Sequence, residues 1–318
     1  MKKILFLFFI GAFIINPDLA SAQCCSAGNP AGGDGSNDGL SKNNWRVFLS
    51  YKYSFSEDFY EKTKNIGSLY DQKSYFNYTH FSLTYGLSTR ISLYSELGYF
   101  LNKTKEINLG EKDIISASGL GDIGLNVRYI ALNTVKPISQ LVFSAGAKAP
   151  IGAFHEELNG AVIPISLQPS SGAFKYNASI FYSRKKATSK FGWNSFALFE
   201  LSSTINKGFL IYHYGNYFQY ALAGTYTFLP NFSLIANSKF EWRGKDKREE
   251  GLLIESTGSR VLYLNPQLVY SLPSKWSFVL MSEIPIYKNV NGSQITNQFS
   301  FQIGIKKSLS LLNNKTSE

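Results

Sequence analysis

Residues 232–243 read Phe-Ser-Leu-Ile-Ala-Asn-Ser-Lys-Phe-Glu-Trp-Arg. Apolar side chains at positions 232, 234, 236, 240 and 242 alternate with polar or charged ones at 233, 237, 239, 241 and 243. Successive side chains of an extended strand point to opposite faces, so this segment has one apolar and one charged face. A strand of a transmembrane β-barrel has this pattern, with its apolar face toward lipid and its polar face toward the lumen.

The same alternation recurs in about a dozen segments, and no helix-period run of comparable length competes with them. A strand of about eleven residues tilted by about 45° rises about 26 Å, which matches the apolar band of such barrels. The sequence therefore predicts an all-β protein, a transmembrane antiparallel up-and-down β-barrel of about 12 strands. The expected strands are 45–55, 75–87, 91–101, 118–132, 138–149, 173–183, 192–204, 216–228, 232–243, 260–272, 276–287 and 297–309.

The links between these strands alternate in length. Short turns at 86–89, 133–137, 184–190, 229–231 and 272–275 alternate with long polar loops at 56–74, 102–117, 150–172, 205–215, 244–259 and 288–296. Outer-membrane barrels place short turns in the periplasm and long loops outside the cell. This order requires an even strand count and places both termini in the periplasm. A soluble β-sandwich, the alternative, would not show alternating link lengths.

The N-terminus has the features of a secretory leader. A basic pair at 2–3, an apolar core at 4–15 and small residues at 20–22 predict a signal peptide over 1–22, cleaved before Gln23. The apolar core is too short to span a bilayer as a helix. Together with the barrel pattern, the leader predicts export to the outer membrane of a Gram-negative bacterium.

The rest of the chain divides into three parts: an irregular segment at 23–44, the barrel at 45–309 and a tail at 310–318. The first of these is rich in Gly, Asn, Asp and Ser, and two placements are open for it: a plug inside the lumen or a free periplasmic segment. Cys24 and Cys25 are the only cysteines. Two adjacent thiols alone make a poor tetrahedral site, so they are only weak metal candidates and we expect no metal.

Composition agrees with a membrane barrel. Aromatic residues make up 15% of the chain, and such barrels concentrate aromatics in two interfacial girdles. The formal net charge is +10. For an exported barrel, this charge indicates anionic lipid headgroups or anionic solutes as partners rather than nucleic acid. The expected partners are therefore outer-membrane lipid and a small-molecule solute.

Ionisable residues on the polar strand faces are the candidate site residues. Placing Arg or Lys against lipid at the membrane midplane costs about 2–4 kcal/mol, so these side chains are expected inside. They have two possible uses: a ladder of structural salt bridges, or a charged constriction that selects solutes. The candidates are Glu96, Asp122, Arg128, Lys148, Lys175, Glu200, Lys239, Glu241, Arg243, Glu283 and Lys306.

Two short motifs carry a family resemblance. The Gly-Leu-Gly-Asp run at 119–122 and the Pro-Ile-Gly run at 150–152 resemble those of the "MetA-pathway of phenol degradation" family of outer-membrane proteins. The resemblance implies a barrel for uptake or export of small, often hydrophobic compounds, with Asp122 as a candidate binding residue.

An enzyme is the remaining class to weigh. The twelve-stranded outer-membrane phospholipase needs a Ser nucleophile beside a His base. His80 and Ser82 share a strand face here, but that face points to the lumen, whereas a lipid-cleaving site must meet lipid. We therefore predict no enzymatic activity and no cofactor. The expected function is passive passage or binding of a small, possibly hydrophobic or aromatic, molecule. The alternative is a plugged structural or adhesion barrel, or a partner of a periplasmic protein, without transport.

Overall fold

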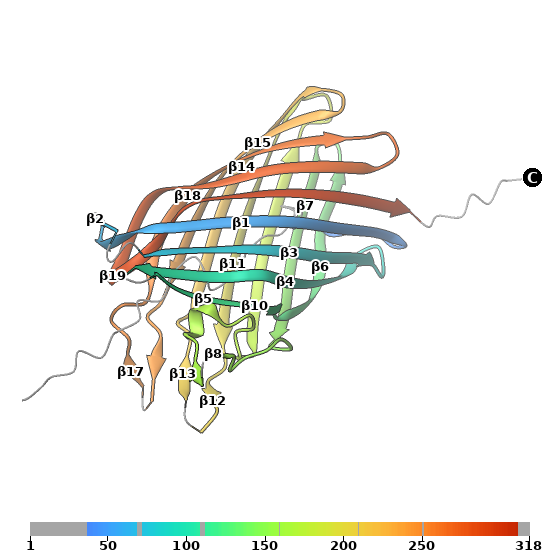
Figure 1. Ribbon diagram of the computed structural model, residues 1–318. Helices are drawn as coiled ribbons and strands as arrows, with labels where there is room; N and C mark the ends of the chain where they lie inside the picture. Colours follow the sequence, from blue (N-terminus) through green and yellow to red (C-terminus); the bar gives the residue numbers. More distant parts are fainter. Residues whose placement is uncertain are drawn as a thin grey trace, which may run out of the picture.

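The structure, a computed structural model, describes residues 37–68, 72–108, 112–158, 160–208, 210–249 and 251–310. The expected signal peptide, Cys24, Cys25 and the tail from residue 311 onward lie outside the described residues. One large antiparallel sheet closes on itself through pairing of its last strand with its first (Figure 1). The predicted fold class, an all-β transmembrane-type barrel, is confirmed.

Eleven labelled strands form the barrel wall, each antiparallel to its neighbours, in the order β19, β18, β15, β14, β11, β10, β7, β6, β4, β3, β1. They are β1 (Asn44–Lys62), β3 (Lys73–Gly86), β4 (Ile91–Asn108), β6 (Ile123–Val135), β7 (Ile138–Ala149), β10 (Lys175–Lys185), β11 (Phe191–Ser202), β14 (Tyr217–Leu229), β15 (Phe232–Arg243), β18 (Ser259–Ser271) and β19 (Trp276–Ser310).

The last of these strands, β19, runs along the barrel wall twice, once in each direction, and each run counts as one crossing of the membrane span. A closed ring of antiparallel pairs needs an even number of crossings, and β19 pairs with β18 through residues 277–290 and with β1 through residues 290–310. The chain therefore reverses near Gly292, whose φ of 58° suits a tight turn. Across this hairpin, Lys288 Nζ donates to Thr296 Oγ1 at 3.1 Å. Eleven labelled strands with β19 counted twice give twelve crossings, the predicted number.

Small elements decorate the long loops at one end of the barrel, while short turns and the C-terminal end of β19 lie at the other (Figure 1). No helix within the described ranges is long and apolar enough to cross a membrane. The loop elements are β2 (Lys64–Gly67), β5 (Lys112–Leu120), β8 (Glu157–Leu158), β9 (Ala161–Val162), η1 (Ile165–Leu167), β12 (Ile205–Asn206), β13 (Ile211–His213), β16 (Lys247–Arg248) and β17 (Leu252–Leu253).

One expected strand, 118–132, is wrong at its start. Residues 118–120 belong to β5, which pairs with β4, and the chain leaves the sheet at Gly121 and Asp122 before β6 begins. The amide of Gly121 donates to the Gly98 carbonyl at 2.8 Å, which fixes this break against β4. In addition, β1 and β4 run well beyond the expected ends at 55 and 101, so part of each predicted loop is strand.

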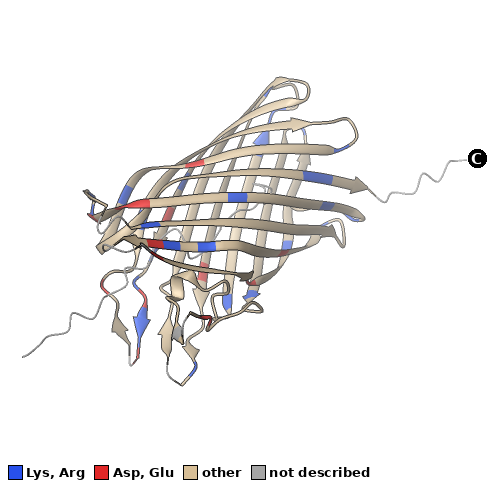
Figure 2. Ribbon diagram, in the orientation of Figure 1, with Lys and Arg blue, Asp and Glu red and all other residues tan. Residues whose placement is uncertain are grey.

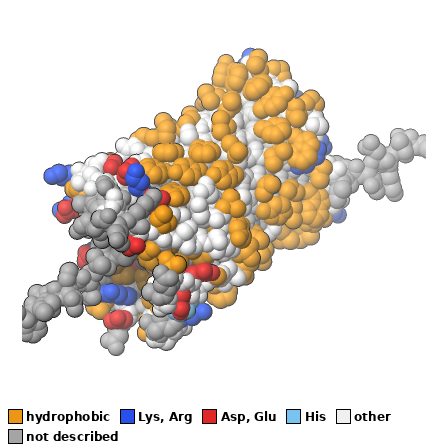
Figure 3. Space-filling view, viewed as in Figure 1, with side chains coloured by type: hydrophobic (Ala, Val, Ile, Leu, Met, Phe, Trp, Pro, Cys, Tyr) orange, Lys and Arg blue, Asp and Glu red, His pale blue; other side chains and the backbone are white. Residues whose placement is uncertain are grey.

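The outer wall is apolar around the barrel. Outward side chains such as Leu49, Val127, Leu280 and Ile303 are about half exposed, while Figure 3 shows charged atoms gathered mostly at the long-loop end. Inward positions carry Ser, Thr, Asn and ionisable residues, and Figure 2 shows acidic and basic residues on neighbouring barrel strands. The outside is thus suited to lipid and the inside to water, as the alternation predicted.

A charge on this outer wall should destabilise the barrel. We expect Val127→Arg on β6 to lower the free energy of unfolding in phospholipid vesicles by about 2–4 kcal/mol, because a guanidinium would face hydrocarbon. The matched control is Asn126→Arg, one residue away on the face that lines the lumen, and its effect should be much smaller. Urea titration followed by tryptophan fluorescence measures both. Equal losses in the two variants would contradict the assignment of faces.

Candidate functional site

All eleven ionisable residues proposed from the sequence point into the barrel. Six of them, on β6, β10, β11, β15 and β19, are only 4–8% exposed. The six buried residues are Arg128, Lys175, Glu200, Lys239, Glu241 and Glu283. The other five line the internal cavities described below. The structure brings most of the eleven candidates together in two chains of ion pairs.

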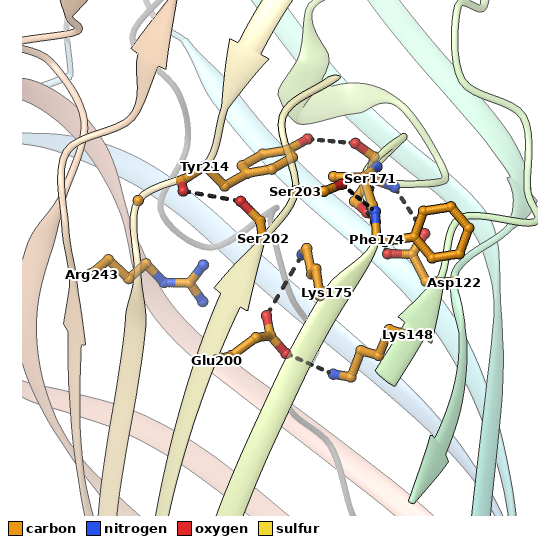
Figure 4. Close-up of polar contacts among 12 residues, drawn as sticks. Asp122, Lys148, Ser171, Phe174, Lys175, Glu200, Ser202, Ser203, Tyr214 and Arg243 are labelled. Carbon is orange, nitrogen blue, oxygen red and sulfur yellow. Dashed lines mark hydrogen bonds and ion pairs between the residues drawn. The ribbon is translucent and has the colours of Figure 1, made fainter. Parts of the chain in front are cut away.

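The first chain of ion pairs joins residues of five strands of one wall and passes over a sixth, β6. Glu96 on β4 contacts His80 on β3 and Lys148 on β7, each at 3.4 Å. Lys148 also contacts Glu200 on β11 at 3.4 Å, and Glu200 in turn contacts Lys175 on β10 at 3.8 Å (Figure 4). Lys148 is thus the cation between two carboxylates, Glu96 and Glu200, on the inner face of this wall.

The second chain lies on the strands that close the barrel. Glu283 on β19 contacts Lys239 on β15 at 2.6 Å and Lys52 on β1 at 3.5 Å. Lys239 also contacts Glu241 at 2.8 Å, and Glu241 contacts Arg243 at 3.8 Å. We call the two chains together the ion-pair belt. Lys52 and His80 were not among the sequence candidates, although both lie on polar strand faces.

Two strands carry uncharged residues where the belt passes over them. On β6, a Cβ at Gly124 would meet the side chain of Glu96, so glycine leaves room for the Glu96–Lys148 contact. On β18, Asn265 donates its Nδ2 to Glu283 Oε2 at 3.5 Å. The belt can therefore link strands that are not direct neighbours in the sheet.

The belt lies beside a chamber in the short-turn half of the lumen, which we call the lumen chamber. Its volume is about 360 Å³, and Glu96, Lys148, Lys239 and Glu283 of the belt line one side of it. Two cavities of about 80 Å³ each lie toward the long loops, and residues of the belt line both of them. The rest of the chamber wall is mixed. Apolar and aromatic side chains, among them Phe196, Leu198 and Met281, lie beside these side-chain amides: Asn126, Asn177, Asn194, Gln219, Asn237, Asn265 and Gln267.

The loop at 150–174 folds over the long-loop side of the belt. The Asp122 carboxylate accepts hydrogen bonds from Ser170 Oγ at 2.7 Å, from the Ser171 amide at 2.9 Å and from Ser171 Oγ at 2.5 Å. The Tyr214 hydroxyl donates to the Ser171 carbonyl at 2.9 Å (Figure 4). Asp122 lines one of the small cavities, and its carboxylate is used to hold this loop in place.

The two sequence motifs meet at this loop. Gly152 of the Pro-Ile-Gly run lies against the carbonyl of Leu120 in the Gly-Leu-Gly-Asp run, and a Cβ at Gly152 would overlap that carbonyl. Farther along the loop, Lys103 Nζ donates to the Gln168 carbonyl at 2.8 Å. The break before β6 and the start of the loop are therefore one structural unit, which brings Asp122 to residues 170–171.

Apolar packing supports the same loop. Ala173, Ile205 and Tyr212 are buried together, and side chains from three long loops pack against them. Burial raises the pKa of Tyr214, and the charges of Asp122 and Asp246 raise it further. Its hydroxyl therefore stays protonated and remains a hydrogen-bond donor. Residues of three long loops thus pack and hydrogen-bond together at this mouth of the barrel.

Residues 37–43 lie inside the barrel at the other end, where inward side chains hold them. The Asp38 carboxylate accepts two hydrogen bonds from the Arg46 guanidinium, at 2.6 and 2.8 Å, and Arg128 donates to the Asp38 carbonyl at 3.0 Å. The Gly39 amide donates to Gln140 Oε1 at 2.9 Å, and Gln140 Nε2 donates back to its carbonyl at 3.2 Å. The described part of the irregular 23–44 segment thus lies inside the barrel, between β1 and β7.

The electrostatics of this contact keep Asp38 ionised. Burial raises the pKa of its carboxyl, but the charge and hydrogen bonds of Arg46, with the charges of Arg128 and Lys306, together lower it below the usual value. Sequence reasoning missed Asp38 because it precedes the first strand, where no alternation assigns a face.

Metal ligands do not gather in the described part of the chain, where no group of three or more His, Cys, Asp or Glu residues could hold an ion. Cys24 and Cys25, the weak metal candidates, lie outside the described residues.

Solved structures similar to this chain are outer-membrane barrels. The COG4313 outer membrane channel from Pseudomonas putida F1 has a TM-score of 0.70 at 15% sequence identity, over 87% of this chain and 100% of that one. The transport unit of the autotransporter AIDA-I from Escherichia coli has a TM-score of 0.50 at 11% identity, over 89% of this chain and 95% of that one. At these identities the likeness shows the fold alone.

Curated proteins give no match to this sequence. A protein-family model does match it, over residues 67–303. This range runs from the end of β2 to the last crossing of β19, and it includes both motifs that carried the resemblance. The chain belongs to the family described as "Putative MetA-pathway of phenol degradation".

Proposed function

We propose that this chain is a gated outer-membrane channel through which a small solute passes passively. The observation that carries the proposal is the lumen chamber of about 360 Å³, which lies between the ion-pair belt on one side and residues 37–43 on the other. A chamber of this size can hold a small molecule, whereas a barrel serving only as structure has no need of one. The solved channel from Pseudomonas putida, similar in fold, supports the same reading.

The chamber wall suits a solute that carries polar groups beside an apolar part. Its amides and ion pairs would lose hydrogen bonds to water without replacement if an apolar molecule filled the chamber, and such unpaired groups are costly. Two buried acceptor atoms of this wall, Asn237 Oδ1 and Asn265 Oδ1, have no protein donor, so a solute with N–H or O–H groups suits them. The apolar side chains of the wall, among them Phe196, Leu198 and Met281, suit the hydrophobic part of a compound of the kind that the family resemblance implied.

Single-channel recording tests the proposal. The mature chain from residue 23 onward, refolded into a planar bilayer, is expected to give brief, discrete conductance steps, because hydrogen-bonded segments lie at both ends of the lumen and must move for a solute to pass. Folding is checked independently by heat-modifiable gel mobility. Folded protein that never conducts, even after its closures are removed by mutation, would contradict the channel.

A second candidate function is a closed barrel that serves as structure or as a partner of another envelope protein. The observation in its favour is that packed loops lie at one end of the lumen and residues 37–43 at the other. The two candidates differ in what happens when a closure is loosened: a channel gains conductance, and a structural barrel whose lumen is filled does not.

Loosening the long-loop closure should open the channel. We expect Asp122→Ala to raise open-channel conductance or open probability about twofold or more, because the loop at 150–174 loses three hydrogen bonds to a charged acceptor. The matched control is Asp113→Ala, an exposed carboxylate on β5 at the same end of the barrel. Identical traces from both variants and the parent protein would show that Asp122 does not hold a gate.

A further inference from the structure

The short-turn end of the lumen holds a carboxylate-binding site that the chain itself fills. We propose that Arg46, Arg128 and Lys306 form a site for a small carboxylate solute, and that Asp38 occupies it as a tethered stand-in for that solute. The proposal rests on the proposed function in taking the lumen chamber as the solute's location, and it names the solute's chemical class.

Arg46 supplies the geometry that selects a carboxylate. Its two terminal nitrogens each donate to a different oxygen of Asp38, at 2.6 and 2.8 Å. This paired arrangement matches the planar fork of a guanidinium to the two oxygens of a carboxylate, and it is the strongest form of such recognition. The Asp38 carboxylate therefore has the position that a solute's carboxylate would take.

Arg128 and Lys306 extend the site to the chamber. The Arg128 guanidinium lies over the Tyr94 ring, 4.1 Å from its centroid, so its plane is held in place. Lys306 comes from β19 on the closing wall, and its charge acts on Asp38. Both residues line the lumen chamber, as does Asn37, the neighbour of Asp38. A solute in the chamber therefore reaches this site directly.

The tether is not part of the sheet, which makes exchange feasible. Residues 37–43 form no strand or helix. Side chains of the wall hold them at Asp38, Gly39 and Leu40, and the Asn43 amide donates to the Gly86 carbonyl at 2.9 Å. The side chain of Asp38 is one-third exposed, compared with 13% for Arg46. A free carboxylate that binds the same cations can therefore displace Asp38 without unfolding any part of the barrel wall.

A tethered ligand raises the concentration at which a free one can compete. The side chain of Asp38 lies six residues before β1 begins, and a short tether of this kind gives an effective concentration of about millimolar or more. The parent protein should therefore bind a free carboxylate weakly. Removing the tethered carboxylate should expose the full affinity of the site.

Isothermal titration calorimetry on the folded, detergent-solubilised mature chain tests this directly. The probes are benzoate and its uncharged match, benzamide, which differ in the carboxylate alone. The variants are Asp38→Ala, Asp38→Asn and Arg46→Gln, and the control is Asp113→Ala. We expect Asp38→Ala to bind benzoate about tenfold more tightly than the parent, Asp38→Asn to lie between them, and benzamide binding to be unchanged throughout.

The Asp38→Ala and Arg46→Gln variants should differ in how they change benzoate binding. If the Asp38–Arg46 pair were merely structural, Asp38→Ala and Arg46→Gln would affect benzoate binding alike. The proposal requires Asp38→Ala to strengthen binding and Arg46→Gln to leave it no tighter than in the parent. Equal benzoate affinity in the parent and Asp38→Ala, with both folded, would overturn it. Because calorimetry needs no conduction, this failure is distinct from a failure of the channel proposal, which bilayer recording tests.

Discussion

Replacing Lys148 with methionine is expected to lower the free energy of unfolding by about 3 kcal/mol, the low end of the range for breaking a buried ion pair. Lys148 contacts both Glu96 and Glu200 at 3.4 Å, and its side chain is 18% exposed. Glu96 would keep the Tyr94 hydroxyl, which donates to it at 2.8 Å. Of its contacts with Lys148 and Lys175, Glu200 would keep only the longer one, with Lys175 at 3.8 Å, so it carries most of the loss.

An exposed ion pair is the matched control for this variant. Lys73 contacts Glu57 at 3.2 Å, but their side chains are 44% and 35% exposed. Water already solvates both groups, so Lys73→Met should cost less than about 1 kcal/mol. Urea unfolding in vesicles measures both variants, and comparable losses would contradict the distinction between belt and surface.

A double-mutant cycle separates the pair from its surroundings. Glu200→Gln removes the carboxylate that Lys148→Met leaves behind, so the double variant should be less destabilised than the sum of the single ones by about 1–2 kcal/mol. Additive losses would mean that the two residues act independently, despite their 3.4 Å contact.

The same substitution should also change ion preference. Lys148 lines both the lumen chamber and the small cavity beyond it, so losing its charge leaves two carboxylates at this partition. Reversal potentials in a salt gradient should therefore shift toward cations. A shift toward anions would place the conduction path elsewhere.

Strand alternation was sufficient to predict the wall of the barrel, because one face of every strand meets lipid and the other meets water. The segment 232–243 quoted at the outset is β15, with the predicted bounds. The same phase placed Glu200 and Lys239 inside. For these residues the sequence carries the answer locally, since a side chain's face depends only on whether its position is odd or even.

Partners across strands could not be predicted in this way. The contact between Lys52 and Glu283 joins positions 231 residues apart, and it depends on how β1 and β19 align when the sheet closes. A shift of one residue in that register would turn either side chain to the other face. The sequence states each strand's phase but not the register between strands distant in the chain.

The prediction of an unbroken strand over 118–132 failed at Gly121 and Asp122 for a different reason. The residues there continue a strand-like pattern, so periodicity gives no sign that the chain leaves the sheet. The cause lies in tertiary contacts. The Gly121 amide donates a hydrogen bond to β4, and the Asp122 carboxylate accepts hydrogen bonds from Ser170 and Ser171, which lie in a loop almost fifty residues later. The placement of 23–44 was left open for the same reason, since residues 37–43 are held inside by contacts with strands distant in the chain, among them β4, β6 and β7.

Deleting residues 23–43 is expected to produce the largest change in conductance of any variant discussed here. Residues 37–43 are held between β1, β6 and β7 at the short-turn end by Asp38 and Gly39. Without them, the lumen chamber of about 360 Å³ would meet the periplasm directly. We expect open probability to rise several-fold, because the energy of these contacts no longer favours the closed state.

The matched control is a shorter deletion, 23–36, which leaves residues 37–43 and all of their described contacts in place. If the closure resides in 37–43, the shorter deletion should conduct like the parent, and only the longer one should open the channel. Equal opening by both deletions would assign the closure to residues before 37, and no opening by either would assign it to the belt or the long loops. In the longer deletion, Arg46, Arg128 and Lys306 lose the Asp38 carboxylate, so its reversal potential should move toward anions. Conductance and ion preference must then change together, because one carboxylate both anchors the segment and neutralises the cations behind it.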